Sequence, residues 1–584
     1  MRKTKIICTI GPATDDPEVL RELMRSGMNV ARLNFSHGNH EEQLERVNRI
    51  KAAREELNLP VAIMLDTKGP EIRTGVFEND RVTLETGSEV TIYQEDRLGN
   101  AAAFSTTYKN LANDLEIGSR ILIDDGLIEL VVKGFAGADV VCTVKTGGEV
   151  ANHKSINLPG VNLHLPALTE KDELDLAFAV EHEFDFIAAS FIRKPSDVME
   201  IRRVLHELGD DSIRIVAKIE NQEGVDNYVS IIEVSDGIMV ARGDLGVEIP
   251  AHVVPSIQKK LVQTAYHMGK PSITATQMLD SMIRNPRPTR AEASDVANAV
   301  LDGASAVMLS GETAIGKYPL ESIRMMEKIL SYTESSIDYW DEFRRSAFEL
   351  TPNVANAVSH ACCMTAMDLN AKAIITVTHS GRTARLISRF RPECPIIATT
   401  VTQRSCYQLA LSWGVIPMLI DVYENTDELF EESVKVAQNA ELVENGDIVV
   451  ISCGTPVGMS GTTNTLKVEN VGAVLGRGTP VCKNPELQVS GNVLLARDIE
   501  TISDQEQLVK DQDFILVAEQ TAANLLPWIR KAKAVIVEDK SATGHAIATC
   551  QALEIPLIYG CENLTQLVKT GQQVVMDFAT GIVG

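Results

Sequence analysis

Short apolar runs alternate with longer amphipathic segments from Thr4 to Leu309, and this alternation constrains the fold more than any other feature. The runs are rich in Ile, Val and Ala, as expected for parallel strands with both faces buried. Helical segments such as His40–Leu57 and Pro255–Met268 separate them. The eight predicted strands are Lys5–Ile10, Met28–Leu33, Val61–Leu65, Phe184–Ala189, Ile213–Ile219, Gly237–Val240, Pro271–Ala275 and Ala304–Leu309. Eight β/α units indicate a closed (β/α)8 barrel of the TIM type rather than an open sheet.

The alternation is interrupted between residues 70 and 166 by short, β-branched segments separated by turns. The chain leaves the barrel at Pro70 and returns near Pro166, so two proline-stiffened connections could form a hinge. The barrel would comprise residues 1–69 and 167–345, and residues 70–166 would form an all-β lid over its catalytic face. The predicted lid strands are Arg81–Leu84, Glu89–Tyr93, Arg120–Ile123, Ile128–Val132 and Val140–Val144.

Two further α/β domains are predicted beyond the barrel. Residues 346–471 begin with a long helix and continue with alternating strands and helices, namely Val354–Leu369, Ala373–Val377, Thr383–Phe390 and Pro395–Ala398. A glycine-rich stretch, Gly472–Thr479, leads into residues 472–584, an extra C-terminal α/β domain of the swivelling type. Its predicted strands are Phe514–Ala518, Ala534–Glu538 and Pro556–Tyr559.

Composition argues against several classes of protein. A net charge of -25 argues against nonspecific binding to nucleic acid or to anionic membranes, since both select for basic surfaces. No apolar stretch approaches the roughly 20 residues that span a bilayer, and the apolar run at the N-terminus is too short for a signal peptide. The ten cysteines include no C-x-x-C pair, so they indicate neither a zinc site nor a disulfide framework. We expect a cytoplasmic protein.

A group of charged residues at the predicted strand ends carries the chemistry. Lys218 and Glu220 stand two residues apart at the end of the fifth strand, and residues i and i+2 of a strand face the same way. The sixth strand ends in Arg242-Gly-Asp244. If these strands are neighbours, two carboxylates and a lysine share one site, which suits Mg²⁺ and a migrating phosphoryl group. Buried salt bridges are the structural alternative, although charges are costly to bury.

Polar motifs also follow other strands, and active sites of such barrels lie at the C-terminal ends of the strands. Five of these strings resemble signatures of the pyruvate kinase family and occur in the family's order, around a β insertion of the right size. They are Ala31-Arg-Leu-Asn-Phe-Ser-His-Gly38, Asp66-Thr-Lys-Gly-Pro-Glu-Ile-Arg73, Lys218-Ile-Glu-Asn221, Ala241-Arg-Gly-Asp-Leu-Gly-Val-Glu248 and Ala275-Thr-Gln-Met-Leu279. The resemblance runs from Met1 to about Val471.

The resemblance implies phosphoryl transfer from phosphoenolpyruvate to ADP in glycolysis, giving pyruvate and ATP. Glu220 and Asp244 would hold Mg²⁺, and Lys218 would neutralise the phosphoryl group in flight, a gain specific to the transition state. Arg32 would clamp phosphate oxygens, for which its guanidinium fork is suited. The backbone amides of Gly243 and Asp244 would cradle the substrate carboxylate.

Three residues are candidates for the proton step that the resemblance implies. Thr276 would line the far face of the enolate, where a proton must arrive after the phosphoryl group leaves. Ser310 and Glu312 could relay that proton through water. Which group gives the proton stays open at this point.

The resemblance also implies a monovalent cation and a nucleotide site. Four residues match the family's K⁺ ligands: Asn34, Ser36, Asp66 and Thr67. Glu71 supports dependence on K⁺, because members that manage without K⁺ tend to carry a lysine there. Arg73 and Lys154 match the nucleotide-phosphate contacts, and His37 lies near them, although His37 could be structural and Lys154 a solvated loop charge. No Walker-type G-x-x-x-x-G-K-[ST] string occurs, so the cleft between barrel and lid would hold the nucleotide.

The third domain contains a candidate site for an allosteric effector. Hydroxyls, a glycine and free amides precede a helix there, a pattern typical of a phosphate nest, although an ordinary N-cap by Ser380 is the alternative. The family's sugar-phosphate effectors bind at this loop, and Ser460–Asn464 could supply the opposite lip. The resemblance also implies a homotetramer. The candidate effector residues are Thr378, Ser380, Gly381, Arg382 and Thr383.

Residues 472–584 lie outside the common family core. They are similar to the extra C-terminal domain of some bacterial pyruvate kinases, which is related to the phosphohistidine domain of phosphoenolpyruvate-utilising enzymes. There a histidine in a Thr-Ser-His-Ala setting accepts a phosphoryl group. Here the string is Ala542-Thr-Gly-His-Ala546, so His545 is kept and glycine replaces the serine. A structural or interface role is therefore favoured.

Two other functions fit part of the sequence. A Mg²⁺-dependent lyase or aldolase acting on pyruvate enolate could use the same barrel, but Arg73, Lys154 and the lid argue against it. A phosphate-sensing protein without catalysis is the second, but every transferred catalytic position is intact. Formation of pyruvate from phosphoenolpyruvate only when ADP is present would discriminate among the three.

Overall fold

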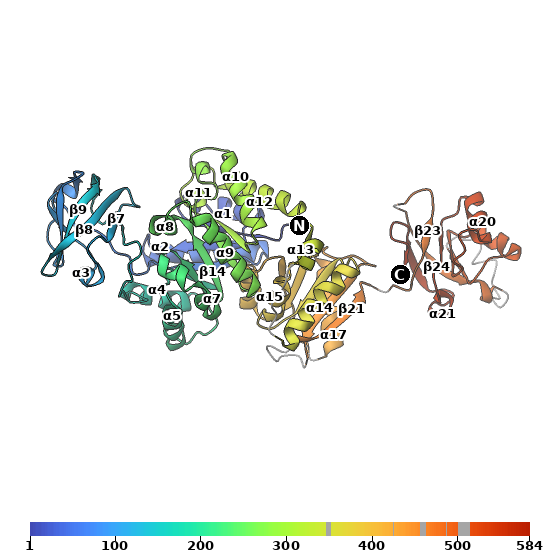
Figure 1. The fold of residues 1–584 in the computed structure, drawn as a ribbon. Coiled ribbons are helices and arrows are strands. Elements are labelled where there is room, and N and C mark those ends of the chain that lie inside the picture. The colour runs from blue at the N-terminus through green and yellow to red at the C-terminus, as the bar shows by residue number, and fades with distance from the viewer. Residues whose placement is uncertain (346–351, 424, 456–462, 473, 486, 500–513) are drawn as a thin grey trace. The chain divides into compact units, whose positions relative to one another are not determined.

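The fold is described from a computed structural model of the chain, which describes residues 1–345, 352–423, 425–455, 463–472, 474–485, 487–499 and 514–584. Two compact units make up the chain: Met1–Met364, Thr376–Thr426 and Ser452–Thr465 form one, and Thr365–Ile375, Asp427–Ile451 and Leu466–Gly584 form the other. Figure 1 labels some of the helices and strands. Within the described residues, no helix is both long and apolar enough to cross a membrane.

Eight parallel strands close into a barrel in the order β1-β16-β15-β14-β13-β12-β3-β2. All eight predicted barrel strands are confirmed, with ends that differ by at most two residues. The fifth and sixth strands, β13 and β14, are direct neighbours, as the predicted metal site requires. The bounds are β1 Lys5–Thr9, β2 Val30–Asn34, β3 Ala62–Asp66, β12 Phe186–Ala189, β13 Arg214–Ile219, β14 Gly237–Ala241, β15 Ser272–Ala275 and β16 Ala306–Leu309.

Helices alternate with the barrel strands and share one continuous apolar core with their outward-facing residues. The ends of α2 show why these segments are helical: Asn39 accepts the Glu42 N–H as N-cap, and Asn58 closes the other end in the left-handed conformation. The helices of this region are α1 Pro17–Arg25, α2 His40–Leu57, α4 Glu170–Glu181, α5 Pro195–Glu207, α6 Gln222–Asp226, α7 Tyr228–Val234, α8 Arg242–Glu248, α9 Val254–His267, α10 Arg290–Leu301, α11 Gly311–Ala314, α12 Pro319–Ser335 and α13 Tyr339–Arg345.

Alternate residues of the strands fill the inside of the barrel, and this sets the direction of the residues that follow. The inner core contains Ile7, Val30, Ala62, Met64, Phe186, Ala188, Val216, Met239, Ile273, Ala275, Ala306 and Met308. Side chains two positions apart on a strand face the same way. Thr9 therefore continues the inward row of Ile7, and Lys218 continues the row of Val216. The polar residues at the carboxyl ends of the strands thus converge above the inner core.

The segment between β3 and α4 is the predicted all-β insertion, and all five of its predicted strands are confirmed. It contains a six-stranded sheet in the order β11-β7-β8-β9-β5-β6 and the pair β10-β4, around an apolar core of its own. The elements are β4 Arg81–Leu84, β5 Glu89–Tyr93, β6 Ala103–Ser105, α3 Leu111–Asp114, β7 Arg120–Ile123, β8 Ile128–Ala136, β9 Asp139–Thr146, β10 Gly148–Ala151 and β11 Ile156–Asn157.

A five-stranded sheet with the order β19-β18-β17-β20-β21 follows the barrel in the chain. The predicted helix Val354–Leu369 and strand Ala373–Val377 are present as α14 and β17. The elements are α14 Val354–Asp368, β17 Ala373–Val377, α15 Arg382–Ser388, β18 Ile396–Thr400, α16 Gln403–Leu409, β19 Val415–Leu419, α17 Thr426–Asn439, β20 Ile448–Gly454 and β21 Thr463–Asn470. Ser460, Gly461 and Thr462, predicted as part of an effector lip, lie outside the described residues.

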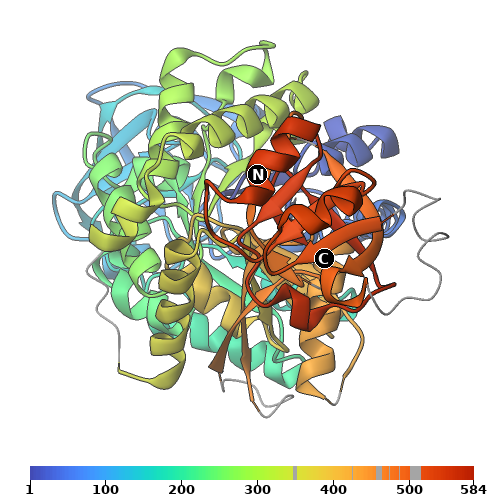
Figure 2. The same ribbon diagram turned by 90° about the vertical axis from the view of Figure 1, so that its right-hand side faces the viewer.

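The C-terminal part forms an eight-stranded sheet in the order β22-β29-β28-β24-β25-β26-β27-β23, drawn in orange to red in Figure 2. Strands β24 to β27 are parallel, and apolar cores cover both faces. The predicted strands are β25 Phe514–Ala518, β26 Ala534–Val537 and β27 Leu557–Tyr559. The helices expected between these strands are α19 Leu526–Ile529 and α20 His545–Leu553. The elements not predicted are β22 Gly476–Arg477, β23 Thr479–Val481, β24 Gln488–Leu495, α21 Leu564–Leu567, β28 Gln573–Asp577 and β29 Ile582–Val583.

Candidate active site

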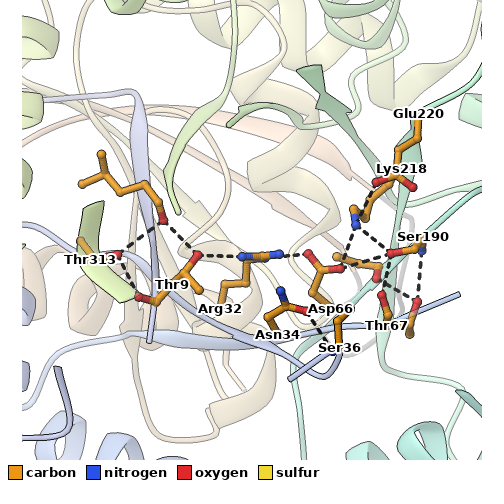
Figure 3. A network of polar contacts seen from close by, with 12 residues as sticks. Thr9, Arg32, Asn34, Ser36, Asp66, Thr67, Ser190, Lys218, Glu220 and Thr313 are labelled. Atoms are coloured by element: carbon orange, nitrogen blue, oxygen red, sulfur yellow. Dashed lines mark hydrogen bonds and ion pairs between the residues drawn. The ribbon is translucent and has the colours of Figure 1, made fainter. Parts of the chain in front are cut away.

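The ammonium of Lys218 lies at the centre of a buried polar network at the carboxyl ends of the barrel strands (Figure 3). Its Nζ is 3.0 Å from Glu220 Oε1 and 3.0 Å from Asp66 Oδ1, and it donates to Ser190 Oγ at 2.7 Å. Although burial alone would lower the pKa of Lys218, the Asp66 and Glu220 carboxylates raise it above its usual value. Lys218 is therefore a fixed positive charge at neutral pH.

Glu220 and Asp244 form the acidic pair expected from the sequence. Glu220 is 1% exposed, and its Oε2 accepts the Phe191 N–H at 2.6 Å. Burial raises the pKa of Glu220 to about 7, with Lys218 opposing this rise and the charge of Asp244 adding to it. Partial desolvation also raises the pKa of Asp244, an exposed residue in the first turn of α8. Glu220 is buried and Asp244 is exposed, yet the pKa values of both carboxylates are raised, so the pair lacks compensating positive charge.

A divalent cation fits this shortage of positive charge. Oxygen ligands from one or two carboxylates are what Mg²⁺ takes from proteins, and water and substrate oxygens complete its shell. In the described part of the chain, no group of three or more His, Cys, Asp or Glu side chains is arranged to hold a metal ion. An ion at Glu220 and Asp244 would therefore depend on ligands from outside the protein as well.

Arg32 is held on two sides and open on the third. Its Nε donates to Asp66 Oδ2 at 2.6 Å, and its Nη1 donates to Thr9 Oγ1 at 2.8 Å. Nη2 donates to no atom of the described residues. Arg32 and Lys218 together hold the pKa of Asp66 below its usual value despite its burial. One carboxylate thus joins the two cations that were predicted to contact phosphate.

The four residues that match K⁺ ligands lie together at the ends of β2 and β3 (Figure 3). Asn34 stands opposite Asp66 in the strand register, and its Oδ1 accepts the Ser36 N–H at 3.0 Å. The Thr67 carbonyl accepts from the Ser190 hydroxyl at 2.6 Å. The structure therefore brings all four residues into one neighbourhood.

The loop after β15 has a backbone conformation that is unusual for its residues. Thr276 and Gln277 have φ angles of 65° and 54°, in the left-handed region that costs free energy for side chains other than glycine and is often found at functional sites. Arg242 supports this loop, because its Nη2 donates to the Thr276 carbonyl at 2.6 Å. The Gly243 N–H donates to Thr276 Oγ1 at 2.9 Å. Gly243 and Thr276, both predicted to contact the substrate, are thus hydrogen-bonded to each other.

Ser310 and Glu312 follow β16 and differ sharply in their environment. Both carboxylate oxygens of Glu312 accept backbone amides, from Leu279 at 3.0 Å and from Ser310 at 2.8 Å. Burial raises the pKa of Glu312. The Ser310 hydroxyl is buried and has no hydrogen-bond partner among the described residues. A water molecule beside Ser310 would satisfy it, since buried polar groups are normally hydrogen-bonded.

A cleft of about 330 Å³ joins the lid to the barrel ends. Arg73 and Lys154 line it together with Asp244. Arg73 pairs with Glu71 at 2.7 Å and Lys154 with Asp124 at 2.8 Å. The structure thus places both predicted nucleotide residues in the cleft with the candidate metal site.

His37 is the predicted nucleotide residue that the structure does not bring to this cleft. Its side chain is exposed, and it is not among the residues that line the cavity. It stays a prediction without geometric support.

The predicted effector loop joins β17 to α15. Gly381, with φ 75°, is the N-cap of α15, so the alternative of an ordinary N-cap by Ser380 is not what the structure has. The Thr383 and Thr463 hydroxyls lie 2.7 Å apart. Arg382 is exposed, whereas Thr378 and Thr383 are buried.

Two residues of the network were missed in the sequence, Thr9 and Ser190. Both directly follow an inward-facing row of the barrel, since Thr9 ends β1 and Ser190 comes just after β12. Alternate residues of each strand face into the barrel, and continuing this row by one more residue predicts that both side chains face inward. Neither hydroxyl belongs to one of the sequence motifs that predicted the site.

The closed barrel, the inserted lid and the buried charges at these strand ends are the arrangement expected of a barrel phosphotransferase. Comparison with known proteins agrees. The family model "Pyruvate kinase, barrel domain" matches residues 1–323, and "Pyruvate kinase, alpha/beta domain" matches residues 356–469. The chain belongs to the pyruvate kinase family.

Individual relatives support the same assignment. The chain is 45% identical to a pyruvate kinase of Sporosarcina psychrophila, over 100% of this chain and 99% of the relative. It is 46% identical to a pyruvate kinase of Geobacillus stearothermophilus, over 100% of this chain and 98% of the relative. A solved pyruvate kinase from Cryptosporidium parvum has a TM-score of 0.77 and 40% identity, and covers 81% of this chain and 96% of its own. The alternative of a lyase or aldolase finds no support in these relatives.

The C-terminal part has a separate likeness. The family model "PEP-utilising enzyme, mobile domain" matches residues 510–581, as the similarity around His545 predicted. His545 begins α20, and its Nδ1 lies 3.0 Å from Thr521 Oγ1.

Proposed function

We propose that this chain transfers the phosphoryl group of phosphoenolpyruvate to ADP, giving pyruvate and ATP, with Mg²⁺ held by Glu220 and Asp244. The observation that carries this proposal is the continuous network in which Arg32, Asp66, Lys218 and Glu220 contact one another in sequence. A divalent ion at the acidic pair would draw negative charge from substrate oxygens. The remaining steps belong to side chains of the protein.

Arg32 and Lys218 provide the positive charge along the path of the phosphoryl group. The open Nη2 edge of Arg32 would bind phosphate oxygens, while its other two donors keep the guanidinium in place. Lys218 would exchange one of its three present contacts for the phosphoryl oxygens as their charge spreads in the transition state. Because both cations are positioned before substrate arrives, little reorganisation is needed during the reaction.

The loop after β15 and the start of α8 would bind the rest of phosphoenolpyruvate. The amides of Gly243 and Asp244 would receive its carboxylate at the N-terminal end of a helical turn. Thr276 lies beside this amide and would face the enolate that needs a proton. The unpartnered hydroxyl of Ser310 and the raised pKa of Glu312 support a relay through water to that face.

We also propose a K⁺ ion at Asn34, Ser36, Asp66 and Thr67, next to the phosphoryl group. Arg73 and Lys154 would bind the phosphates of ADP, with each exchanging its present carboxylate partner for the nucleotide. His37 belongs to the same proposal through the resemblance alone. Asp66, one of these four residues, already joins Arg32 and Lys218, and this supports a role for the ion in phosphate binding.

Regulation and assembly are further parts of the proposal. A phosphorylated metabolite would bind the loop of Thr378, Ser380, Gly381, Arg382 and Thr383, and the chain would form a homotetramer in the cytoplasm. We retain the proposed domains as residues 1–69 with 167–345, residues 70–166, residues 346–471 and residues 472–584.

A coupled assay tests the central claim. Purified protein with phosphoenolpyruvate, ADP, Mg²⁺ and K⁺ should form pyruvate and ATP in equal amounts, and omission of ADP should stop pyruvate formation. Pyruvate formation that continues without ADP would instead indicate hydrolysis or a lyase reaction. No turnover under any of these conditions would contradict the proposal.

A further inference from the structure

Arg32 has a second fixed partner besides Asp66, and the proposed function gives that partner no role of its own. Thr9 is 4% exposed and ends β1, directly opposite Arg32 in the strand register. Its Oγ1 accepts from Arg32 Nη1 at 2.8 Å and donates to the Leu309 carbonyl at 3.0 Å. The single hydroxyl therefore links the guanidinium to the last residue of β16, across the strand between them.

The backbone of Thr9 is held as firmly as its side chain. Thr313 in α11 is fully buried, and its Oγ1 donates to the Thr9 carbonyl at 2.8 Å. A Cβ on Gly11 would stand 2.7 Å from the Ala314 carbonyl oxygen, so the chain leaving β1 lies directly against the same helix. The Thr9 hydroxyl is thus a fixed acceptor rather than a freely rotating one (Figure 3).

The two acceptors of Arg32 define the orientation of the guanidinium plane. Asp66 Oδ2 holds Nε and Thr9 Oγ1 holds Nη1, and two bonds from different edges of a planar group leave it little rotation. Among the described residues, Nη2 is then the one nitrogen of the guanidinium without a hydrogen-bond partner. With Asp66 alone, the guanidinium could turn about the Nε bond, and the open edge would no longer have one direction.

We propose that Thr9 is a positioning residue of the phosphoryl-transfer site, which aims the open edge of Arg32 at the substrate phosphate. Thr9 does not contact the reacting atoms and acts only through Arg32. This inference rests on the proposed function, in which Arg32 binds the phosphate of phosphoenolpyruvate.

The test replaces the hydroxyl without changing the shape of the side chain. Thr9→Val removes the acceptor and should lower kcat/KM for phosphoenolpyruvate on the order of 10- to 100-fold, since hydrogen bonds to charged groups have about this effect. KM for ADP should stay within about threefold, because the nucleotide binds elsewhere. Thr9→Ser keeps the hydroxyl and should restore most of the activity. Thr9→Ala removes the same hydroxyl and replaces Thr9→Val if that variant does not fold.

Two controls separate positioning from a general loss of structure. Thr313→Val removes the bond to the Thr9 carbonyl but leaves the contact with Arg32 in place, so it should lower kcat/KM less than Thr9→Val does, although loss of a buried hydrogen bond lowers its unfolding midpoint. In an Arg32→Lys background, Thr9→Val should change kcat/KM by less than about threefold, because the group that it positions is gone.

Three results would overturn the inference: wild-type kcat/KM in folded Thr9→Val, an equal loss in Thr313→Val, or the full loss persisting beside Arg32→Lys. Each can be told apart from failure of the proposed function. If the unmodified protein does not turn over phosphoenolpyruvate with ADP, the function itself fails. If it does and Thr9→Val matches it, only the role of Thr9 fails.

Discussion

Lys218 Nζ lies 3.0 Å from Glu220 Oε1; Lys218 is the second-last residue of β13, and Glu220 directly follows the strand. A cation and an anion side by side in a buried site would normally be a structural ion pair. Here the same ammonium also pairs with Asp66 at 3.0 Å, while Asp244 adds negative charge near Glu220. A structural ion pair between Lys218 and Glu220 needs neither Asp66 nor Asp244. A site that binds a phosphate group and a divalent ion uses all four charges.

Replacement of Lys218 should abolish most of the activity. In Lys218→Met, the phosphoryl group loses the ammonium that neutralises it in the transition state, and kcat should fall at least about 10²- to 10³-fold, as when one preorganised donor is removed. A lactate dehydrogenase-coupled assay measures it. Lys51→Met, which removes a partly exposed lysine paired with Glu183, is the control and should keep wild-type turnover. A Lys218→Met enzyme with more than a tenth of wild-type kcat would contradict the assigned role.

Loss of one carboxylate should weaken binding of Mg²⁺ even when no reaction takes place. MgCl2 should raise the thermal unfolding midpoint of the wild-type protein, because a ligand that binds only the folded state stabilises it. Glu220→Gln should show little or no rise over the same range of concentration. Glu248→Gln is the control, since Glu248 is in the same helix as Asp244 but accepts from Asn157. An equal rise in wild type and Glu220→Gln would place the ion elsewhere.

The sequence is most informative where a strand is regular. Eight apolar runs predict the barrel, and the period of two predicts that Lys218 lies beside Glu220. What spacing cannot show is that Asp66 joins Arg32 and Lys218, because these contacts connect positions 34 and 152 residues apart. Only closure of the barrel brings them together. The left-handed φ of Thr276 is likewise imposed by tertiary contacts, including that with Arg242.

The C-terminal sheet shows the opposite case. Strand β24, Gln488–Leu495, mixes polar residues and a glycine with its apolar ones, so its sequence lacks a clear strand pattern. It is a strand because β25 and β28 pair with it on either side. The pairing with β28 comes from residues far along the chain, which a local pattern cannot reveal.

Activity should depend on K⁺, and Glu71 should control that dependence. In buffer where tetramethylammonium replaces K⁺ at constant ionic strength, the wild-type rate should fall at least about tenfold. Without K⁺, Glu71→Lys should keep a larger fraction of its rate with K⁺ than the wild type does, because an ammonium near the site can replace the ion. The variant should also change KM for ADP, because it removes the carboxylate that pairs with Arg73 at 2.7 Å and that the nucleotide would displace. Full wild-type turnover without K⁺ would refute the assignment.

His545 should not carry a phosphoryl group. A Cβ on Gly544 would stand 3.0 Å from Asp539 Oδ2, so the start of α20 faces a carboxylate that would repel a phosphoryl group on the neighbouring histidine. Incubation with ³²P-labelled phosphoenolpyruvate or ATP should leave no acid-labile label on the wild-type protein. His545→Ala should keep wild-type kcat. A label present in the wild type and lost in His545→Ala would establish the opposite.

The stability of the barrel should fall as pH rises past the titration of Asp185. This residue is 1% exposed, accepts the Ile63 N–H at 2.8 Å and lies 3.7 Å from Arg54. Burial raises the pKa of Asp185 to about 6, despite the opposing effect of Arg54. The folded state therefore favours the protonated carboxyl, and the associated stability is present below the unfolded-state pKa of 3.8 and is lost as pH rises through about 6.

Comparison with Asp185→Asn isolates this effect, because every other titrating group is common to both proteins. As pH rises from 4 to 7, the free energy of unfolding of the wild type should decrease relative to the variant by on the order of 3 kcal/mol. Urea unfolding followed by tryptophan fluorescence at several pH values measures the difference. Asp185→Glu, which keeps the charge, should retain a pH-dependent penalty. Parallel curves for wild type and Asp185→Asn would show that Asp185 is already ionised at pH 4, with the nearby Arg54 outweighing its burial.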